Sequence, residues 1–297
     1  SSAVLLERKA GAACRAMGYD EIMTYSFDSP NMFDLIRLPQ DSPLRKPIRI
    51  LNPLGEDTSV MRTTAIPSML EVLARNDSYH AKSVRFYELA KIYLPQEGEP
   101  LPREPKMLML GAYGPEMDFF RLKGAVEAVL RAVGTLPAEY APVKDNPTFH
   151  PGRCASVTIA GTPVGVIGQI HPLTAKNYDL DTDVYVAELD FSQLMQLLAP
   201  EATYHPLPKY QAVNRDLAIV CDEALTVAQL EKCISAAGGP LLRKITLFDI
   251  FRGGSVPAGK KSVAFSLELR ADDRTLTDQD SEGVISRVLT RLEQELG

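Results

Sequence analysis

The chain has 297 residues, 45% hydrophobic and 24% charged, which is typical of a soluble globular protein and long enough for two domains. No apolar run reaches the roughly 18–20 residues of a membrane-spanning helix, and the opening SSAVLLERKAG lacks a leader pattern. The net charge of −6 excludes a broadly basic surface that coats nucleic acid. Because the sequence opens without methionine, we expect it to be a segment of a longer polypeptide.

Helix and strand patterns alternate over residues 1–200, which indicates a mixed sheet with helices. Gly18 ends the first predicted helix with a left-handed cap, and Pro67 lies in the first turn of the second. The apolar periodicities predict helices over 2–17, 65–76 and 119–133 and strands over 21–27, 83–94, 106–113 and 184–191, with a hairpin over 154–170.

The stretch APEATYHPLPKY (199–210) holds three prolines and predicts a linker to a second domain, 201–297. Strands are predicted over 215–222, 243–251 and 262–270. Thr226 with Gln229, and Thr277 with Asp280, predict capping boxes that begin two helices. The order β-α-β-β-α is that of a ferredoxin-like fold in which the last strand is missing. The predicted fold class is therefore α+β throughout.

The segment RGGSVPAGKKS (252–262) resembles a phosphate-binding loop, because Gly254, Gly259 and Lys260 match G-x-x-x-x-G-K. Lys261 stands where a magnesium-binding hydroxyl is required, and Pro257 removes one backbone donor. A phosphate-binding loop must also lead into a helix, whereas SVAFSLELR has the period of a strand. We therefore interpret this segment as a β-hairpin.

Isolated cysteines and histidines predict no active site and no metal site. The cysteines are far apart, so we expect buried, reduced thiols in a cytosolic protein; they are Cys14, Cys154, Cys221 and Cys233. Besides His80, three histidines (His150, His171 and His205) precede proline, where a side chain can help to fix a turn. Paired carboxylates lie in polar loops, where solvation explains them.

Several long motifs resemble the C-terminal part of the β subunit of bacterial phenylalanine–tRNA ligases. In the first domain these motifs are LNPLGEDTSVMRTTAIPSMLEVLARN (51–76), SVRFYELAKIY (83–93), DFFRLKGAVEAVL (118–130), FHPGRCASV (149–157) and GVIGQIHP (165–172). In the second domain they are LPKYQAVNRDLAIV, LFDIFRGGSVPAGKKSVAFSLELR and RTLTD. The motifs follow the family's order through nearly the whole chain.

The resemblance implies that the first domain is a class II synthetase-like core without catalytic residues. Arg85 and Glu88 do not have the R-x-E spacing of a class II phosphate-binding strand, and the setting of Arg153 differs from the later arginine motif. In the family, an α subunit performs the ATP- and Mg²⁺-dependent aminoacylation, and two α and two β subunits assemble in the cytoplasm. The family's proofreading and magnesium-associated regions lie before residue 1. We therefore expect this segment to have no catalytic activity, no metal and no cofactor of its own.

The same resemblance implies that the second domain binds the anticodon region of phenylalanine tRNA. A sheet can receive splayed bases while basic side chains hold phosphates. Window 243–261 is locally basic, with five basic residues against Asp249. The predicted RNA contacts are Arg252, Lys260 and Lys261 in the hairpin, supplemented by Lys209, Arg215, Arg243, Lys244 and Arg274.

Each of these residue assignments has a structural alternative. Arg215 can pair with Asp216 at a strand start, and Arg274 can serve the turn before the last helix. The hairpin lysines can protect an exposed strand against aggregation. Aromatic side chains in this domain can stack on bases, although core packing is the more common use; they are Phe248, Phe251 and Tyr210.

Two other functions remain open at this level. A self-sufficient enzyme would bind nucleotide at the 252–262 loop, and ATP binding to the isolated chain would reveal it. A pure assembly module would contact only protein, and loss of tRNA protection on deleting the second domain would exclude it.

Overall fold

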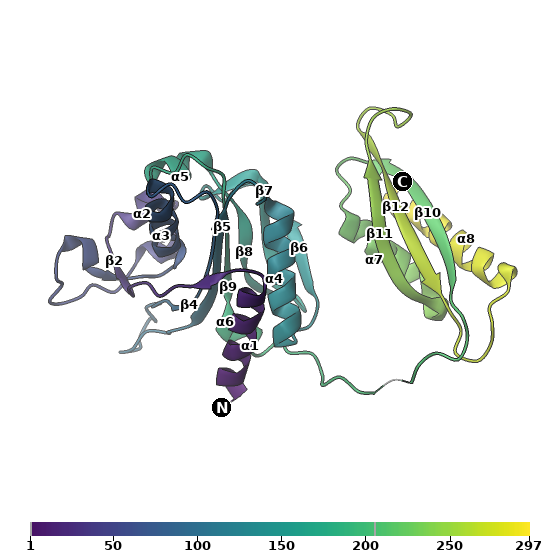
Figure 1. Cartoon of the computed structure of the whole chain (residues 1–297), viewed down its shortest axis with the longest axis horizontal. Helices are drawn as coiled ribbons and strands as arrows, with labels where there is room; N and C mark the ends of the chain where they lie inside the picture. Colours follow the sequence, from purple (N-terminus) through teal and green to yellow (C-terminus); the bar gives the residue numbers. More distant parts are fainter. Residues whose placement is uncertain (1, 205) are drawn as a thin grey trace. The chain divides into compact units, whose positions relative to one another are not determined.

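The structure, a computed structural model, describes residues 2–204 and 206–297, so the predicted turn at His205 lies outside the described residues. The chain divides into two compact units, unit 1 over residues 1–201 and unit 2 over residues 202–297 (Figure 1). Each unit has its own hydrophobic core and is described separately.

Unit 1 is built on a seven-stranded mixed sheet in the order β1-β4-β5-β9-β8-β7-β6. The pairing of β1 with β4 is parallel and the other pairings are antiparallel. The strands are β1 (Asp20–Glu21), β4 (Val84–Lys91), β5 (Lys106–Tyr113), β6 (Ala138–Pro142), β7 (Phe149–Ile159), β8 (Thr162–Ile170) and β9 (Val184–Asp190).

Helices cover both faces of this sheet, as Figure 1 shows. Along β5, Leu108 and Leu110 pack into the core beneath α1 and α4, whereas Met107 and Met109 join the core beneath α3 and α5. The two-residue alternation of a strand thus explains why β5 is apolar from Met107 to Tyr113. The helices are α1 (Ser2–Ala16), α2 (Met32–Leu35), α3 (Ile66–Ser78), α4 (Phe119–Val133), α5 (Pro172–Asn177) and α6 (Phe191–Leu194).

Helix α4 has the bounds that its sequence predicts. Asp118 accepts a hydrogen bond from the Arg121 amide at the N-terminus, and Gly134 ends the helix with a φ of 88°. Its buried stripe includes Leu122, Val126 and Val129, which lie on one helical face. Local signals therefore fix this helix at both ends.

The strand predicted over 21–27 is wrong in its extent, because the chain leaves the sheet after Ile22. The Thr24 backbone N–H and hydroxyl donate to the Glu88 carboxylate at 3.1 and 2.7 Å, replacing ladder hydrogen bonds. The segment then forms β2 (Phe27–Asp28), which pairs with β3 (Val60–Met61) in a separate sheet. A buried side chain from a distant strand therefore decides this path.

Arg62 and Glu88 form a buried polar network at the same place. Their side chains are 2% and 6% exposed, and Arg62 Nη2 lies 3.4 Å from Glu88 Oε1. Arg62 also donates to the Lys91 carbonyl at 2.8 Å and to the Thr24 hydroxyl at 2.6 Å. The pair links β3, β4 and the departing chain after β1.

Unit 2 has the predicted β-α-β-β-α order, with strands arranged β10-β12-β11 and all antiparallel. Both predicted capping boxes are present, Thr226 with Gln229 and Thr277 with Asp280. The elements are β10 (Val213–Asp222), α7 (Val227–Gly238), β11 (Leu242–Phe251), β12 (Lys260–Leu269) and α8 (Asp278–Leu296). Within the described residues of both units, no helix is long and apolar enough to span a membrane.

Candidate nucleic-acid interface

The sheet of unit 2 has one covered and one open face. Val263, Phe265 and Leu267 of β12 are fully buried against the core formed with α7 and α8. The strand register places the alternate residues on the opposite side, which we call the open face. It comprises Asn214, Asp216, Ala218, Val220 and Asp222 of β10, Lys260, Ser262, Ala264, Ser266 and Glu268 of β12, and Lys244, Thr246, Asp249 and Phe251 of β11.

The loop between β11 and β12 is a hairpin connection, which confirms the interpretation drawn from the sequence. Gly253, Gly254 and Gly259 adopt φ values of 82°, 61° and 78°, which side-chain-bearing residues rarely take. Figure 1 shows the loop projecting past the end of the sheet. Strand β12 follows this loop directly, so the loop does not lead into a helix whose N-terminus could hold a nucleotide phosphate.

One end of the open face, beside this loop, carries an apolar platform. Phe251, Ser262 and Val220 are neighbours across the three strands. Phe251 and Val220 are 49% and 53% exposed. The next row contains Ala264 and Ala218, whose side chains are small, and the carboxylate of Asp249. An exposed ring beside small residues can stack an unpaired base, an interaction worth about 1–3 kcal/mol.

Charges on the rest of the open face do not favour phosphate. Away from the hairpin end, three carboxylates lie on it, against one ammonium group and the guanidinium that pairs with Glu268. The carboxylates belong to Asp216, Asp249 and Glu268, the ammonium group to Lys244, and the guanidinium to Arg270, which donates to Glu268 at 2.6 Å. An RNA backbone that crossed the centre of the sheet would be repelled, so phosphate contacts are confined to its margins.

Arg252 and Lys260 lie beside the apolar platform, and each is held by a carboxylate. Arg252 Nε donates to Glu223 Oε1 at 2.9 Å, and Lys260 Nζ lies 2.8 Å from Asp222 Oδ1. All four side chains are between 39% and 63% exposed. These two cations are accessible and close to the platform, so they remain the best-placed phosphate ligands among the predicted residues.

Lys261 points to the covered face and is only 6% exposed. Its ammonium donates to the backbone carbonyls of Glu223, at 3.0 Å, and Leu225. This geometry gives Lys261 a structural role and does not favour the predicted phosphate contact. The sequence contains the signal, because the alternation of Val263, Phe265 and Leu267 extends back to residue 261.

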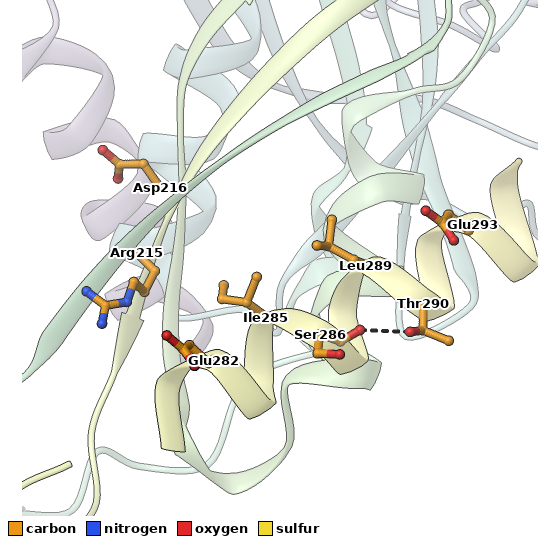
Figure 2. A pocket seen from close by; sticks show the side chains of 8 residues that line it. All are labelled: Arg215, Asp216, Glu282, Ile285, Ser286, Leu289, Thr290 and Glu293. Carbon is orange, nitrogen blue, oxygen red and sulfur yellow. Dashed lines mark hydrogen bonds between the residues drawn. The ribbon is translucent and has the colours of Figure 1, made fainter. Parts of the chain in front are cut away.

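Arg215 lies on the helix side of the sheet and binds α8. Its guanidinium donates to Asp278 at 2.9 Å and to the Ser281 hydroxyl at 3.0 Å, whereas the sequence alternative paired it with Asp216. Figure 2 shows Arg215 at the edge of a groove between β10 and α8, with a volume of about 440 Å³. Glu282 and Glu293 of α8 also line this groove, so its carboxylates outnumber its single arginine. Such a groove does not suit a polyanion.

The remaining predicted contacts are dispersed. Arg243 donates to Asp272 at 2.7 Å, and Arg274 donates to both carboxylate oxygens of Asp280. The hydrogen bonds from Arg274 and Thr277 hold the pKa of Asp280 well below its usual range. Arg274 therefore supports the capping box of α8, as its structural alternative predicts. Lys209 and Lys244 are exposed and, within the described part of the chain, lie in no ion pair.

The unit 1 residues compared above with class II phosphate-binding motifs form hydrogen bonds or ion pairs within unit 1. Arg85 donates to the Met17 carbonyl, and Glu88 binds Thr24 and Arg62. Arg153 donates to Gln169 at 2.6 Å. These side chains are therefore engaged within the unit rather than arranged around a phosphate.

The cysteines are buried as predicted, and two of the histidines make local hydrogen bonds to the backbone. All four cysteines are buried, and burial raises the pKa of Cys14 and of Cys154 to about 12. His150 accepts a hydrogen bond from the Gly152 amide at a register shift within β7. His171 accepts one from the Leu173 amide and caps the N-terminus of α5. Among the described residues, no group of three or more potential ligands could hold a metal ion.

Two known domain families match the two units. The family described as phenylalanyl tRNA synthetase beta chain CLM domain matches residues 1–191, and the ferredoxin-fold anticodon binding domain matches residues 208–297. A pyrrolysyl-tRNA synthetase structure from Desulfitobacterium hafniense is similar, with a TM-score of 0.54 and 17% identity. The match covers 65% of this chain and 68% of that structure, and it shows a class II synthetase fold.

Curated relatives of the whole chain include phenylalanine–tRNA ligase beta subunits. The phenylalanine–tRNA ligase beta subunit of Clostridium acetobutylicum is 42% identical over 94% of this chain, and that of Clostridium tetani is 40% identical over 98%. These alignments cover 35% and 37% of the relatives, so the chain spans about a third of their length. From the family matches and the fold together, the chain belongs to the phenylalanyl-tRNA synthetase β-chain family.

Proposed function

We propose that the chain is a non-catalytic part of a phenylalanine–tRNA ligase, in which unit 1 assembles with the α subunit and unit 2 binds the anticodon region of phenylalanine tRNA. The observation that carries this proposal is the match of unit 2 to the anticodon-binding family, together with an open sheet face that ends in an apolar platform. The assembly module without RNA contact is less consistent with this match. The proposed holoenzyme contains two α and two β subunits in the cytoplasm and uses ATP and Mg²⁺ to attach phenylalanine to tRNA.

The open face fits a single-stranded loop better than a duplex. Phe251 offers a ring for stacking, and Arg252 and Lys260 lie beside it for the adjoining phosphates. Sequence-specific RNA recognition commonly uses unstacked bases of loops in this way. The carboxylates over the rest of the face restrict the RNA backbone to the hairpin end. The proposed contact therefore involves Arg252, Lys260 and Phe251 rather than all eight basic residues.

Deleting residues 202–297 from the β subunit of the whole enzyme is expected to abolish protection of the anticodon loop while the α subunit still co-purifies. Unit 1 and unit 2 have separate cores, so the deletion removes one compact unit. Chemical footprinting of phenylalanine tRNA on the purified complex measures the protection. Undiminished protection of the anticodon loop would contradict the RNA-binding role of unit 2.

A further inference from the structure

We propose that Asp222 and Glu223 compete with RNA phosphate for Lys260 and Arg252, so that RNA binding exchanges two internal ion pairs for two phosphate pairs. This inference rests on the proposed function. It assigns these two carboxylates a role in specificity, because they prevent the hairpin end from attracting phosphate by charge alone.

The backbone fixes both carboxylates in place. Asp222 is the direct cross-strand partner of Lys260 at the end of β10. The Glu223 amide donates to the Gly259 carbonyl at 2.9 Å, which joins the chain after β10 to the start of β12. Lys261 contacts the Glu223 carbonyl from the covered side. The backbone therefore holds the Asp222 and Glu223 carboxylates beside Lys260 and Arg252.

These ion pairs are exchangeable because they are exposed. The side chains of Arg252 and Glu223 are 56% and 48% exposed, and those of Lys260 and Asp222 are 39% and 63% exposed. Ion pairs in such positions add little to folding stability. A phosphate that approaches from the apolar platform can therefore replace either carboxylate without disturbing the fold.

The exchange accounts for RNA binding by a unit that is not basic. Unit 2 has twelve basic and thirteen acidic side chains. At the hairpin end, Arg252 and Lys260 are balanced by Asp222 and Glu223, so distant RNA experiences little attraction. Binding then depends on contacts that bring a phosphate close, such as stacking of a base on Phe251. An RNA that stacks no base on Phe251 does not bring a phosphate close to Arg252 and Lys260, so the exchange does not increase its affinity.

The test uses the whole enzyme, with Asp222→Asn and Glu223→Gln in the full β subunit, singly and together. A phosphate bound to either cation lies about 6 Å from the carboxylate, where removal of one like charge in water strengthens binding about three-fold. The double variant is expected to bind phenylalanine tRNA about ten-fold more tightly at low salt. The logarithmic salt dependence is expected to steepen, because in the unaltered enzyme the displaced carboxylates remain beside the bound phosphates and offset part of the neutralisation.

The matched control is Glu295→Gln, which removes the carboxylate of another exposed arginine pair. Arg291 Nε lies 2.7 Å from Glu295 Oε1 on α8, which packs against the covered face. This variant is expected to bind tRNA as the unaltered enzyme does. Circular dichroism verifies that each variant is folded.

The experiments distinguish failure of the proposed competition from failure of the proposed RNA-binding function of unit 2. If deletion of residues 202–297 weakens tRNA binding but Asp222→Asn/Glu223→Gln leaves affinity and salt dependence unchanged, or weakens binding, the competition is wrong and the RNA-binding role stands. If the deletion leaves tRNA binding intact, the proposed function of unit 2 is wrong, and the competition falls with it.

Discussion

Gly165→Ala is expected to destabilise unit 1 by about 3–5 kcal/mol. A Cβ at this position would lie 2.1 Å from the Glu188 carbonyl oxygen and 2.9 Å from the Leu189 Cα, both in the backbone of β9. That backbone cannot retreat, because β9 lies between β5 and β8 in the sheet. The φ of 158° adds strain for a residue with a side chain, and overpacking and backbone strain each cost about 1–3 kcal/mol.

Gly124→Ala is the matched control for this substitution. Gly124 lies exposed in the interior of α4, with no atom within 4 Å of an added Cβ. Alanine there is expected to stabilise the helix by about 1 kcal/mol. Urea unfolding followed by the near-ultraviolet tyrosine signal measures both variants, because the chain lacks tryptophan and only Tyr204 and Tyr210 of its eleven tyrosines lie outside unit 1. Equal stability of the two variants would show that β8 and β9 do not pack this closely.

Arg62→Met is expected to cost about 3–5 kcal/mol, since it leaves the Glu88 carboxylate buried without its cation. Both side chains are almost fully buried, and Arg62 also satisfies the Lys91 carbonyl and the Thr24 hydroxyl. The double variant Arg62→Met/Glu88→Gln removes the remaining buried charge. Its free energy of unfolding is expected to exceed that of Arg62→Met by at least about 2 kcal/mol. Urea unfolding of the two single variants and the double variant gives the coupling energy.

Two outcomes would contradict this account of the network. Additive losses in the double variant would mean that Arg62 and Glu88 contribute independently of one another. A loss below about 1 kcal/mol for Arg62→Met would mean that solvent reaches the pair, as in an exposed salt bridge.

Local signals in the sequence predict much of the fold. The Asp118 cap, the apolar stripe and Gly134 define α4, and two capping boxes define the starts of α7 and α8. The path after Glu21 is not local, because Glu88 reaches Thr24 from a strand more than sixty residues away. Strand β6 also carries a weak pattern that ends in Pro142, and its place at the sheet edge comes from pairing with β7.

The candidate interface is predicted only in part for the same reason. Composition identifies the basic window, but the ion pairs depend on strand register, which places Asp222 opposite Lys260. Register likewise brings Phe251 and Val220 together across β12, although thirty residues separate them in the chain. Lys261 is the exception, since a period of two already places it on the buried face.

The most direct measurement is the affinity of the whole enzyme for phenylalanine tRNA when Arg252→Gln and Lys260→Gln are combined. The matched control is Arg291→Gln on α8, whose ion pair has similar exposure. Loss of two charge-assisted contacts predicts binding weaker by about ten-fold or more for the double variant and unchanged binding for the control. Equal affinity of the double variant and the unaltered enzyme would contradict the claim that the hairpin end of unit 2 contacts tRNA.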